Sequence, residues 1–315
     1  MGLHPQAKAL LKIFISKGLP PIEELPVDEA RASFKAMSQK LNRSEKIARV
    51  EDRKIPGFKD DITIRIYHPD ETENLPALIF FHGGRWVIGD LDTHDHLCRQ
   101  IANESRFVVI SVDYSLAPER KFPVAVEDAY MASKWVSDHA EELSADKNRI
   151  AVGGDSAGGN LAAVVSYLSI VRDTPFIKYQ ILFYPSIGYE RTASYEQFDE
   201  GFNLDKSTMS WFRTHYLDDS NDMMNPLAAP ILIPDETTKD LPPAYILTAE
   251  CDPLRDGGEN YADKLKKAGV ETKYACYPGM IHGFLCMTEP LDDGRRAISE
   301  AAKVLKTRFN EKVAR

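Results

Sequence analysis

Short apolar runs of strand length alternate with helical patterns along most of this 315-residue chain. Several of these runs are almost continuously apolar, as expected of central strands that helices cover on both faces. The alternation predicts an α/β fold with a mostly parallel sheet flanked by helices. The predicted strands are residues 47–53, 62–68, 77–81, 107–113, 149–153, 179–184, 245–248 and 272–277.

The predicted helices connect these strands and cover the sheet. Pro56 and Gly57 mark a turn between the first two strands, so an antiparallel hairpin is expected to open the sheet. The helical patterns fall at residues 93–104, 124–142, 157–171, 258–268 and 291–310.

Two stretches interrupt this alternation. Residues 1–45 are helical in pattern, and residues 186–235 are rich in aromatic and turn residues. The second stretch is too long for a simple crossover and too apolar for a linker. We expect both to form one discontinuous helical cap over the end of the sheet whose loops carry the chemistry. The α/β core would then comprise residues 46–185 and 236–315.

Charge and composition exclude several classes of partner. The net charge of -9 argues against nucleic acid, because phosphate binding needs a surplus of Lys and Arg on one face. No apolar run reaches the roughly 18 residues of a membrane span, and the N-terminus lacks a signal-peptide pattern. We therefore expect a soluble cytoplasmic protein. Buried free thiols are favoured over a disulfide for the cysteines at 98, 251, 276 and 286.

The sequence GDSAG at 154–158 follows a predicted strand and precedes a predicted helix. This is the context that the G-x-S-x-G pattern requires, with a nucleophilic serine on a strained turn. Its glycines let strand and helix approach closely, and the helix N-terminus favours developing negative charge. Taken alone, the motif could equally be an ordinary glycine-rich turn or one that holds a phosphate. Together with the motifs described next, it predicts Ser156 as a nucleophile.

A second glycine loop comes directly after the strand at 77–81. Glycines there let the main chain present N–H donors to an oxygen that becomes negative during acyl transfer. We expect such donors at Gly83 and Gly84 in this loop and at Ala157 after the nucleophile. His82 is expected to brace the loop. By itself this stretch would be a simple glycine turn, and its place before GDSAG favours the oxyanion role.

Among the eight histidines, His282 differs by following the last predicted strand. It lies in CYPGMIHGF, where Gly279 and Gly283 leave room for its ring. A serine hydroxyl is a weak nucleophile unless a base removes its proton. We therefore expect His282 to act as the general base for Ser156.

The order Ser, then Asp or Glu, then His requires an acid between these two residues and just after a strand. Asp252, which follows the strand at 245–248, is the favoured orienter of the histidine. Glu250 and Asp256 are the alternatives. An N-cap role at the start of the next helix would explain Asp256 fully.

The segment GDLDTHDH at 89–96 contains ligand types that suit a metal. Carboxylates at a helix start are expected anyway, because they complement the helix dipole and can cap the first turn. Asp92 or Thr93 as an N-cap needs no metal, and the spacing fits no standard metal signature. We therefore expect neither a metal nor another cofactor.

With these motifs the chain resembles the hormone-sensitive-lipase-like branch of microbial carboxylesterases, over nearly its whole length. The resemblance lies in FFHGGRWVIGDLDTHD, VDYSLAPERKFP, GGDSAGGNLA, DPLRDGGENYA and MIHGF. It implies an α/β-hydrolase fold with a helical cap and hydrolysis of short- to medium-chain carboxylic esters through an acyl-enzyme. It also implies the same catalytic and oxyanion residues, a small-molecule substrate, no cofactor and a possible homodimer.

One departure from the family concerns the glycine loop. The family has a third glycine where this chain has Arg85. Because a non-glycine residue rarely takes a positive φ, either this position is not left-handed or the loop is reshaped. Arg85 and Trp86 are therefore expected to alter the pocket, with a preference for acidic or polar acyl groups. The apolar pocket candidates, each of which could instead pack cap against core, are Phe202, Leu204, Trp211 and Phe212.

Two other functions stay open at this point. The chain could hydrolyse another acyl bond, in an amide or a carbamate. It could also be a non-catalytic small-ligand receptor on the same fold. The presence of Ser156, Asp252 and His282 together tells against the receptor.

Overall fold

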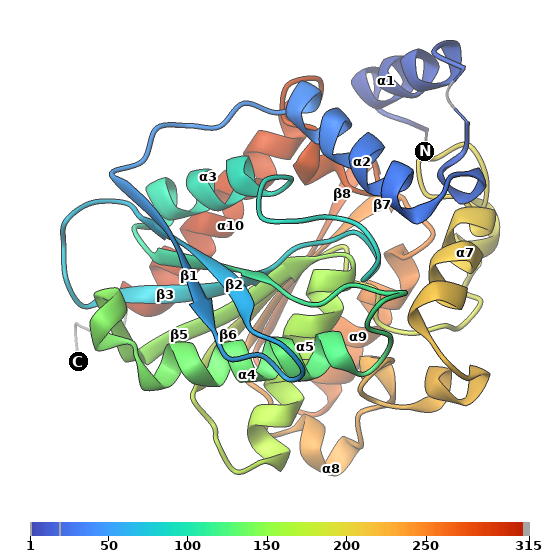
Figure 1. Ribbon diagram of the computed structural model, residues 1–315. Helices are drawn as coiled ribbons and strands as arrows, with labels where there is room; N and C mark the ends of the chain where they lie inside the picture. Colours follow the sequence, from blue (N-terminus) through green and yellow to red (C-terminus); the bar gives the residue numbers. More distant parts are fainter. Residues whose placement is uncertain (1, 19, 311–315) are drawn as a thin grey trace.

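A computed structural model describes residues 2–18 and 20–310, which contain a sheet of eight strands in the order β1-β2-β4-β3-β5-β6-β7-β8 (Figure 1). Strand β2 pairs antiparallel with β1 and β4, and the remaining pairs are parallel. The strands are β1 Arg49–Ile55, β2 Ile62–His68, β3 Leu75–Phe81, β4 Val108–Asp113, β5 Ala145–Asp155, β6 Ile177–Phe183, β7 Ala244–Cys251 and β8 Thr272–Ile281.

The predicted α/β fold is confirmed, including the hairpin that opens the sheet. Each predicted strand coincides with or overlaps an observed one, and 62–68 matches β2. Strand β5 is longer than predicted because it begins at Ala145, which pairs with Leu75 of β3. The polar residues 146–149 interrupt the apolar run, so this part of the strand is specified by its neighbour and not by its own pattern.

The main helices form two layers around the sheet. Helices α3 and α10 cover one face with one apolar cluster, and α4, α5 and α9 cover the other face with a second cluster. The α-helices are α1 Pro5–Ser16, α2 Val27–Leu41, α3 Asp95–Ser105, α4 Val124–Asp138, α5 Ala157–Val171, α6 Ala193–Gln197, α7 Lys206–Tyr216, α8 Asp235–Thr238, α9 Arg255–Lys267 and α10 Asp292–Asn310. Short 3₁₀ turns lie at Ile22–Glu24, Glu141–Leu143, Ser220–Met224, Pro230–Leu232 and Phe284–Cys286.

Figure 1 shows helices α1, α2 and α7 gathered at one end of the sheet. Several contacts attach the N-terminal helices there, among them two to main-chain carbonyls of the sheet end and its loops. The main-chain N–H of His4 donates to the Gly279 carbonyl at 3.0 Å, and Arg31 Nε donates to the Val87 carbonyl at 2.9 Å. Both stretches that we expect to form a cap contribute to this end of the molecule. Their division from the core stays a prediction.

The beginnings of two helices differ from the predictions. Helix α3 starts at Asp95, and its N-cap residue His94 makes no side-chain cap bond, so neither Asp92 nor Thr93 caps it. Thr93 instead forms a local turn with Asp90, whose Oδ1 accepts the Thr93 N–H at 2.8 Å. Helix α9 starts at Arg255, before the position that was predicted as its cap.

All four cysteines are free thiols, so the preference for thiols over a disulfide is confirmed. Only Cys98 and Cys251 are buried, however, because Cys276 is exposed and Cys286 is half-buried. Within residues 2–18 and 20–310, none of the helices combines the length and the apolar character needed to cross a membrane.

Candidate active site

Ser156, His282 and Asp252 lie in a hydrogen-bonded line at the end of the parallel strands. Ser156 Oγ lies 3.0 Å from His282 Nε2, and His282 Nδ1 lies 2.8 Å from Asp252 Oδ2. The second oxygen, Asp252 Oδ1, accepts the N–H of Leu254 at 2.8 Å. Asp252 is 0% exposed, Ser156 4% and His282 8%. The imidazole is therefore held between a buried carboxylate and a hydroxyl that reaches a cavity.

The turn that carries Ser156 depends on the glycines before and after it. Ser156 has φ 56° and ψ −114°, a sparsely populated conformation that costs about 1–3 kcal/mol. An added Cβ at Gly154 would lie 2.4 Å from the Phe81 carbonyl oxygen, and one at Gly158 only 1.8 Å from it. Because β3, β5 and α5 approach this closely, neither position can accept a side chain without backbone movement.

Asp252 is brought to His282 by the end of β7, while its two predicted competitors bind elsewhere. Glu250 Oε2 accepts the Gly279 N–H at 2.7 Å. Asp256 Oδ2 accepts the N–H of Ser194 at 2.7 Å, so its role is to tie α6 to α9 and not to cap α9.

Gly279 does not serve the purpose that we predicted for it. A Cβ at this position would lie 2.6 Å from the main-chain nitrogen of His4, so the glycine admits the N-terminal segment and not the ring of His282. Gly283, with φ 78°, is the glycine directly after the histidine, and a Cβ there would meet only Met287 Cε at 3.6 Å and Asn203 Nδ2 at 3.9 Å.

The glycine loop after β3 corrects one of the predicted oxyanion donors. The N–H of Gly83 donates to Asp155 Oδ1 at 2.8 Å, so it is already used. Among the described residues, the N–H groups of Gly84, Arg85 and Ala157 donate to no acceptor. Gly84 has φ 115°, and a Cβ there would lie 2.0 Å from the Ile88 carbonyl oxygen. The available donors are therefore Gly84 and Ala157, with Arg85 as one that we did not predict.

His82 braces this loop, as its position in the sequence suggested. Its Nδ1 donates to the Gly83 carbonyl at 2.7 Å, and its ring stacks on Tyr114 with centroids 4.3 Å apart. The Tyr114 hydroxyl donates to the His82 carbonyl at 2.7 Å. Burial lowers the pKa of His82 to about 4, so the ring is neutral at ordinary pH.

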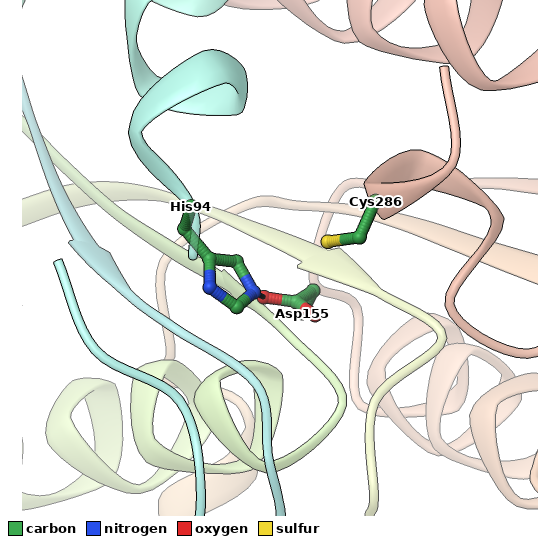
Figure 2. Close-up of side chains that lie close together, drawn as sticks. All are labelled: His94, Asp155 and Cys286. Carbon is green, nitrogen blue, oxygen red and sulfur yellow. Dashed lines mark ion pairs between the residues drawn. The ribbon is translucent and has the colours of Figure 1, made fainter. Parts of the chain in front are cut away.

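A cluster of three side chains lies next to the turn that carries Ser156, and we did not predict this cluster from the sequence. Figure 2 shows His94, Asp155 and Cys286, with His94 Nε2 3.1 Å from Asp155 Oδ1. Burial alone would lower the pKa of His94, but the charge of Asp155 outweighs it and raises that pKa well above its usual value. Burial likewise opposes ionisation of Asp155, yet His94 and the Gly83 N–H hold its pKa low. The two side chains form an ion pair.

The ligand atoms of His94, Asp155 and Cys286 lie within 4.8 Å of one another, so these residues could hold a metal. The ion pair and the Gly83 N–H already balance Asp155, so its burial requires no ion. The acidic residues of the 89–96 segment bind other side chains instead. Lys35 binds both Asp90 and Asp92, at 2.7 and 2.6 Å, so these carboxylates do not converge with His94.

A cavity of about 370 Å³ opens beside Ser156 and His282, and a second of about 260 Å³ lies next to it. Leu204 and Phe212, two of the four apolar pocket candidates, line the first. Parts of α1, α2 and the segment between them form one side of the first cavity. Phe212 and Arg85 border both cavities, which makes these two side chains the boundary between them.

Two of the four apolar pocket candidates are placed elsewhere. Phe202 packs edge-on against Phe198, with ring centroids 4.9 Å apart, and Trp211 packs against Phe212 and the apolar core. Neither lines either of these cavities. Trp86 lines the second cavity and stacks on Tyr216 with centroids 4.1 Å apart. Helical spacing alone did not reveal which face of α7 turns inward.

For Arg85 we predicted either a backbone that is not left-handed or a reshaped loop, and the first of these alternatives is wrong. Arg85 has φ 51° and Trp86 φ 60°, so two non-glycine residues in succession are left-handed. Each such residue costs roughly 1–2 kcal/mol. The loop thus keeps the backbone that a glycine would favour, and the arginine side chain is accommodated in it.

Comparisons with known proteins agree with this fold and site. Residues 78–286 match the family model for the alpha/beta hydrolase fold. The carboxylic ester hydrolase LipN of Mycobacterium tuberculosis is 42% identical over 279 residues, which cover 84% of this chain and 73% of that relative. The chain belongs to the α/β-hydrolase family, and the resemblance that its motifs indicated is confirmed.

Two solved structures extend the likeness over almost the whole chain. The hyperthermophilic esterase from the archaeon Pyrobaculum calidifontis is 42% identical with a TM-score of 0.93, and the match covers 98% of this chain and 99% of that one. An ester hydrolase from the metagenome of Lake Arreo, complexed with a bipyridine phosphonate derivative, is 40% identical with a TM-score of 0.95 and the same coverage.

Proposed function

We propose that this protein is a serine carboxylesterase that hydrolyses short- to medium-chain carboxylic esters through an acyl-enzyme on Ser156. The observation that carries the proposal is the line of contacts from Ser156 Oγ to His282 Nε2 at 3.0 Å and from His282 Nδ1 to Asp252 Oδ2 at 2.8 Å. Its relatives and structural neighbours named as ester hydrolases support the same reaction.

In this mechanism, Ser156 Oγ attacks the ester carbonyl while His282 Nε2 takes its proton. Asp252 accepts a hydrogen bond from the Nδ1–H of His282, which fixes the tautomer and stabilises the imidazolium. The tetrahedral oxyanion receives main-chain N–H bonds from Gly84, Arg85 and Ala157. His282 then gives its proton to the leaving alcohol, and the acyl group stays on Ser156. Water attacks this acyl-enzyme with His282 again as the base, which releases the acid.

The apolar cavity beside Ser156 supports a substrate with an acyl chain of limited length. Its volume of about 370 Å³ lies at the lower end of the range for small-molecule sites. The walls include Leu204 and Phe212 from the segment we assign to the cap and Phe34 and Met37 from α2. We therefore place chain-length preference in the cap. A homodimer and a cytoplasmic location remain predictions.

A series of p-nitrophenyl esters from acetate to palmitate, with wild type and the Ser156→Ala variant, tests the proposal. Wild type is expected to hydrolyse the shorter esters, and the variant to lose activity by at least about 10⁴-fold. Ser299→Ala on α10, a residue that lines neither cavity, serves as the matched serine control. Equal rates for wild type and Ser156→Ala would refute the proposal, and faster cleavage of the matching anilide would assign an amidase instead.

A further inference from the structure

Arg85 is a buried cation to which the described residues offer neither a hydrogen-bond acceptor nor an ion pair. Its side chain belongs to a residue that is 8% exposed, and its Nε and Nη2 atoms donate to no acceptor among the described residues. It forms no ion pair within residues 2–18 and 20–310. Burial lowers the pKa of Arg85 to about 10, so the guanidinium still carries its charge at neutral pH.

A buried charge of this kind is costly. Removing an ion from water costs several kcal/mol unless a partner and hydrogen bonds compensate for it. Arg85 adds a left-handed backbone at φ 51°, so its side chain and its main chain are both unfavourable in the free protein. A ligand that supplies the missing negative charge would relieve the first of these costs.

Other donors around Arg85 are also unpaired. Tyr189 Oη and Trp86 Nε1 are buried and make no hydrogen bond with the described residues. Both residues line the second cavity together with Arg85. A guanidinium, a phenol hydroxyl and an indole N–H are all able to donate, which suits an anion with several acceptor oxygens.

The charge around the second cavity points the same way. Its cationic lining residues are Arg85, Arg191, Lys206 and Arg213, and Glu190 is the one acidic side chain in its wall. The pKa of Tyr189, which burial raises, is pulled down in part by the charges of Arg85 and Arg213. The cavity is therefore positive on balance and holds about 260 Å³, enough for the carboxylate end of a small substrate.

We propose that Arg85, with Tyr189, binds a carboxylate carried by the substrate, so that the preferred esters are monoesters of short dicarboxylic acids. This inference rests on the proposed function, because the ester must lie at Ser156. Arg85 borders both cavities, so one molecule can place its ester beside Ser156 and its free carboxylate beside the guanidinium. Arginine suits this role because its planar fork binds a carboxylate with two parallel hydrogen bonds.

The kinetic test compares the monoethyl esters of succinate, glutarate and adipate with ethyl esters of neutral monocarboxylic acids of equal chain length. Release of acid is followed by pH-stat. Wild type is expected to favour at least one monoester in kcat/KM, through a lower KM. In Arg85→Gln, which keeps the main-chain N–H, the ratio of monoester to neutral ester is expected to fall by about tenfold or more.

Arg85→Lys and Tyr189→Phe are the companion variants. Lysine keeps the charge but not the fork, so it is expected to restore only part of the ratio. Loss of the Tyr189 hydroxyl is expected to lower the ratio less than loss of the arginine charge. If wild type hydrolyses neutral esters well and the Arg85→Gln ratio equals that of wild type, the inference fails while the proposed function stands.

A binding test separates the two proposals further, because it needs no turnover. Glutarate is added to Ser156→Ala, and the melting temperature is followed with and without the Arg85→Gln substitution. Glutarate is expected to raise the melting temperature of Ser156→Ala by roughly 2 °C or more and to leave the double variant unchanged. Equal shifts in both proteins, or none in Ser156→Ala, would overturn the carboxylate site. Inactivity of wild type on every ester combined with a glutarate shift would instead overturn the esterase, and with it the monoester preference, while the carboxylate site at Arg85 would stand.

Discussion

Asp155 joins the nucleophile turn to the glycine loop. Its Oδ1 accepts the Gly83 N–H at 2.8 Å and lies 3.1 Å from His94 Nε2. A Cβ on Gly83 would lie 2.3 Å from the other oxygen, Asp155 Oδ2, so the loop and the carboxylate are in tight contact. The residue before Ser156 therefore fixes the position of the loop that carries the proposed oxyanion donors, and His94 holds that residue in place.

The importance of His94 can be measured by removing it. His94→Ala leaves the buried Asp155 carboxylate without its cation, so we expect the free energy of unfolding to fall by about 3 kcal/mol or more. We expect kcat to fall more than KM changes, because the glycine loop shifts while the cavity remains. Urea unfolding and ester kinetics measure both effects.

Asp155→Asn is the companion to His94→Ala. An asparagine Oδ1 still accepts the Gly83 N–H, and without the carboxylate His94 can simply stay neutral. We therefore expect a smaller loss of stability than in His94→Ala. Equal losses in the two variants would contradict this account of the pair.

The close approach at Gly158 leads to a second prediction. A Cβ there would lie 1.8 Å from the Phe81 carbonyl oxygen, so we expect Gly158→Ala to fold poorly and to lose activity. Gly257→Ala in α9 is the matched control, because nothing lies within 4 Å of its Cβ position. We expect the control to be neutral or up to about 1 kcal/mol more stable. Thermal unfolding of both variants tests this, and similar melting temperatures would contradict it.

At the scale of elements, strands and helices could be predicted because each carries its own pattern. The helix at 157–171 and the strand at 62–68 match to the residue. The places where elements begin could not be predicted as well. The beginnings of α3 and α9 depend on tertiary contacts, such as that of Asp256 with Ser194, which local capping rules do not contain.

The parts of the site that follow local patterns could be predicted, and the parts that depend on tertiary contacts could not. Ser156, Asp252 and His282 each follow a parallel strand of the same sheet, so their proximity could be expected from the sequence. The pair of His94 with Asp155 joins the loop before α3 to the end of β5, and no local sequence pattern predicts it. The hydrogen bond from the Gly83 N–H to Asp155 could not be predicted either, because it also joins residues far apart in the sequence.

Two cationic side chains of helix α2, Arg31 and Lys35, bind groups elsewhere in the molecule and help to hold the helix in place. Arg31 donates to the carbonyls of Val87 and Ala117 at 2.9 and 3.0 Å and also binds Glu119. Lys35 binds Asp90 and Asp92. Because Phe34 and Met37 of the same helix wall the cavity beside Ser156, these contacts hold one side of that cavity.

Removing Arg31 should therefore loosen this wall. We expect Arg31→Ala to lose about 1–3 kcal/mol of stability, because it leaves main-chain acceptors unpaired, and to raise KM for the longer esters more than for the acetate. Arg43→Ala is the control, since the Arg43 side chain is 83% exposed and its pair with Glu289 should contribute little. Ester kinetics on a chain-length series measure the effect, and equal KM changes in both variants would contradict it.

At the scale of the whole molecule, two buried neutral histidines make the fold sensitive to acid. Burial lowers the pKa of both His82 and His96 to about 4, from an ordinary value of 6.5. Unfolded chains bind these protons more readily, so this contribution to stability is complete above pH 6.5 and is lost as the pH falls toward 4. We expect each of these histidines to lower the free energy of unfolding by about 2 kcal/mol at pH 5 relative to neutral pH.

Urea unfolding between pH 8 and pH 4 measures this loss. We expect His96→Gln, which removes one of the two groups, to be less stable than wild type at pH 8 but to lose less stability on acidification. A wild-type stability that stays constant from pH 7 to pH 4.5 would contradict the prediction.

The cavity beside Ser156 takes its walls from both ends of the described chain. Residues between Phe14 and Leu41 form one side, and His282, Gly283, Cys286 and Met287 form another. During synthesis on a ribosome, the early wall emerges long before the histidine and the acid that would complete the hydrogen-bonded line. A nascent chain can thus fold much of its sheet while the site stays incomplete, and ester cleavage would begin only when β8 has joined the sheet and His282 after it is in place.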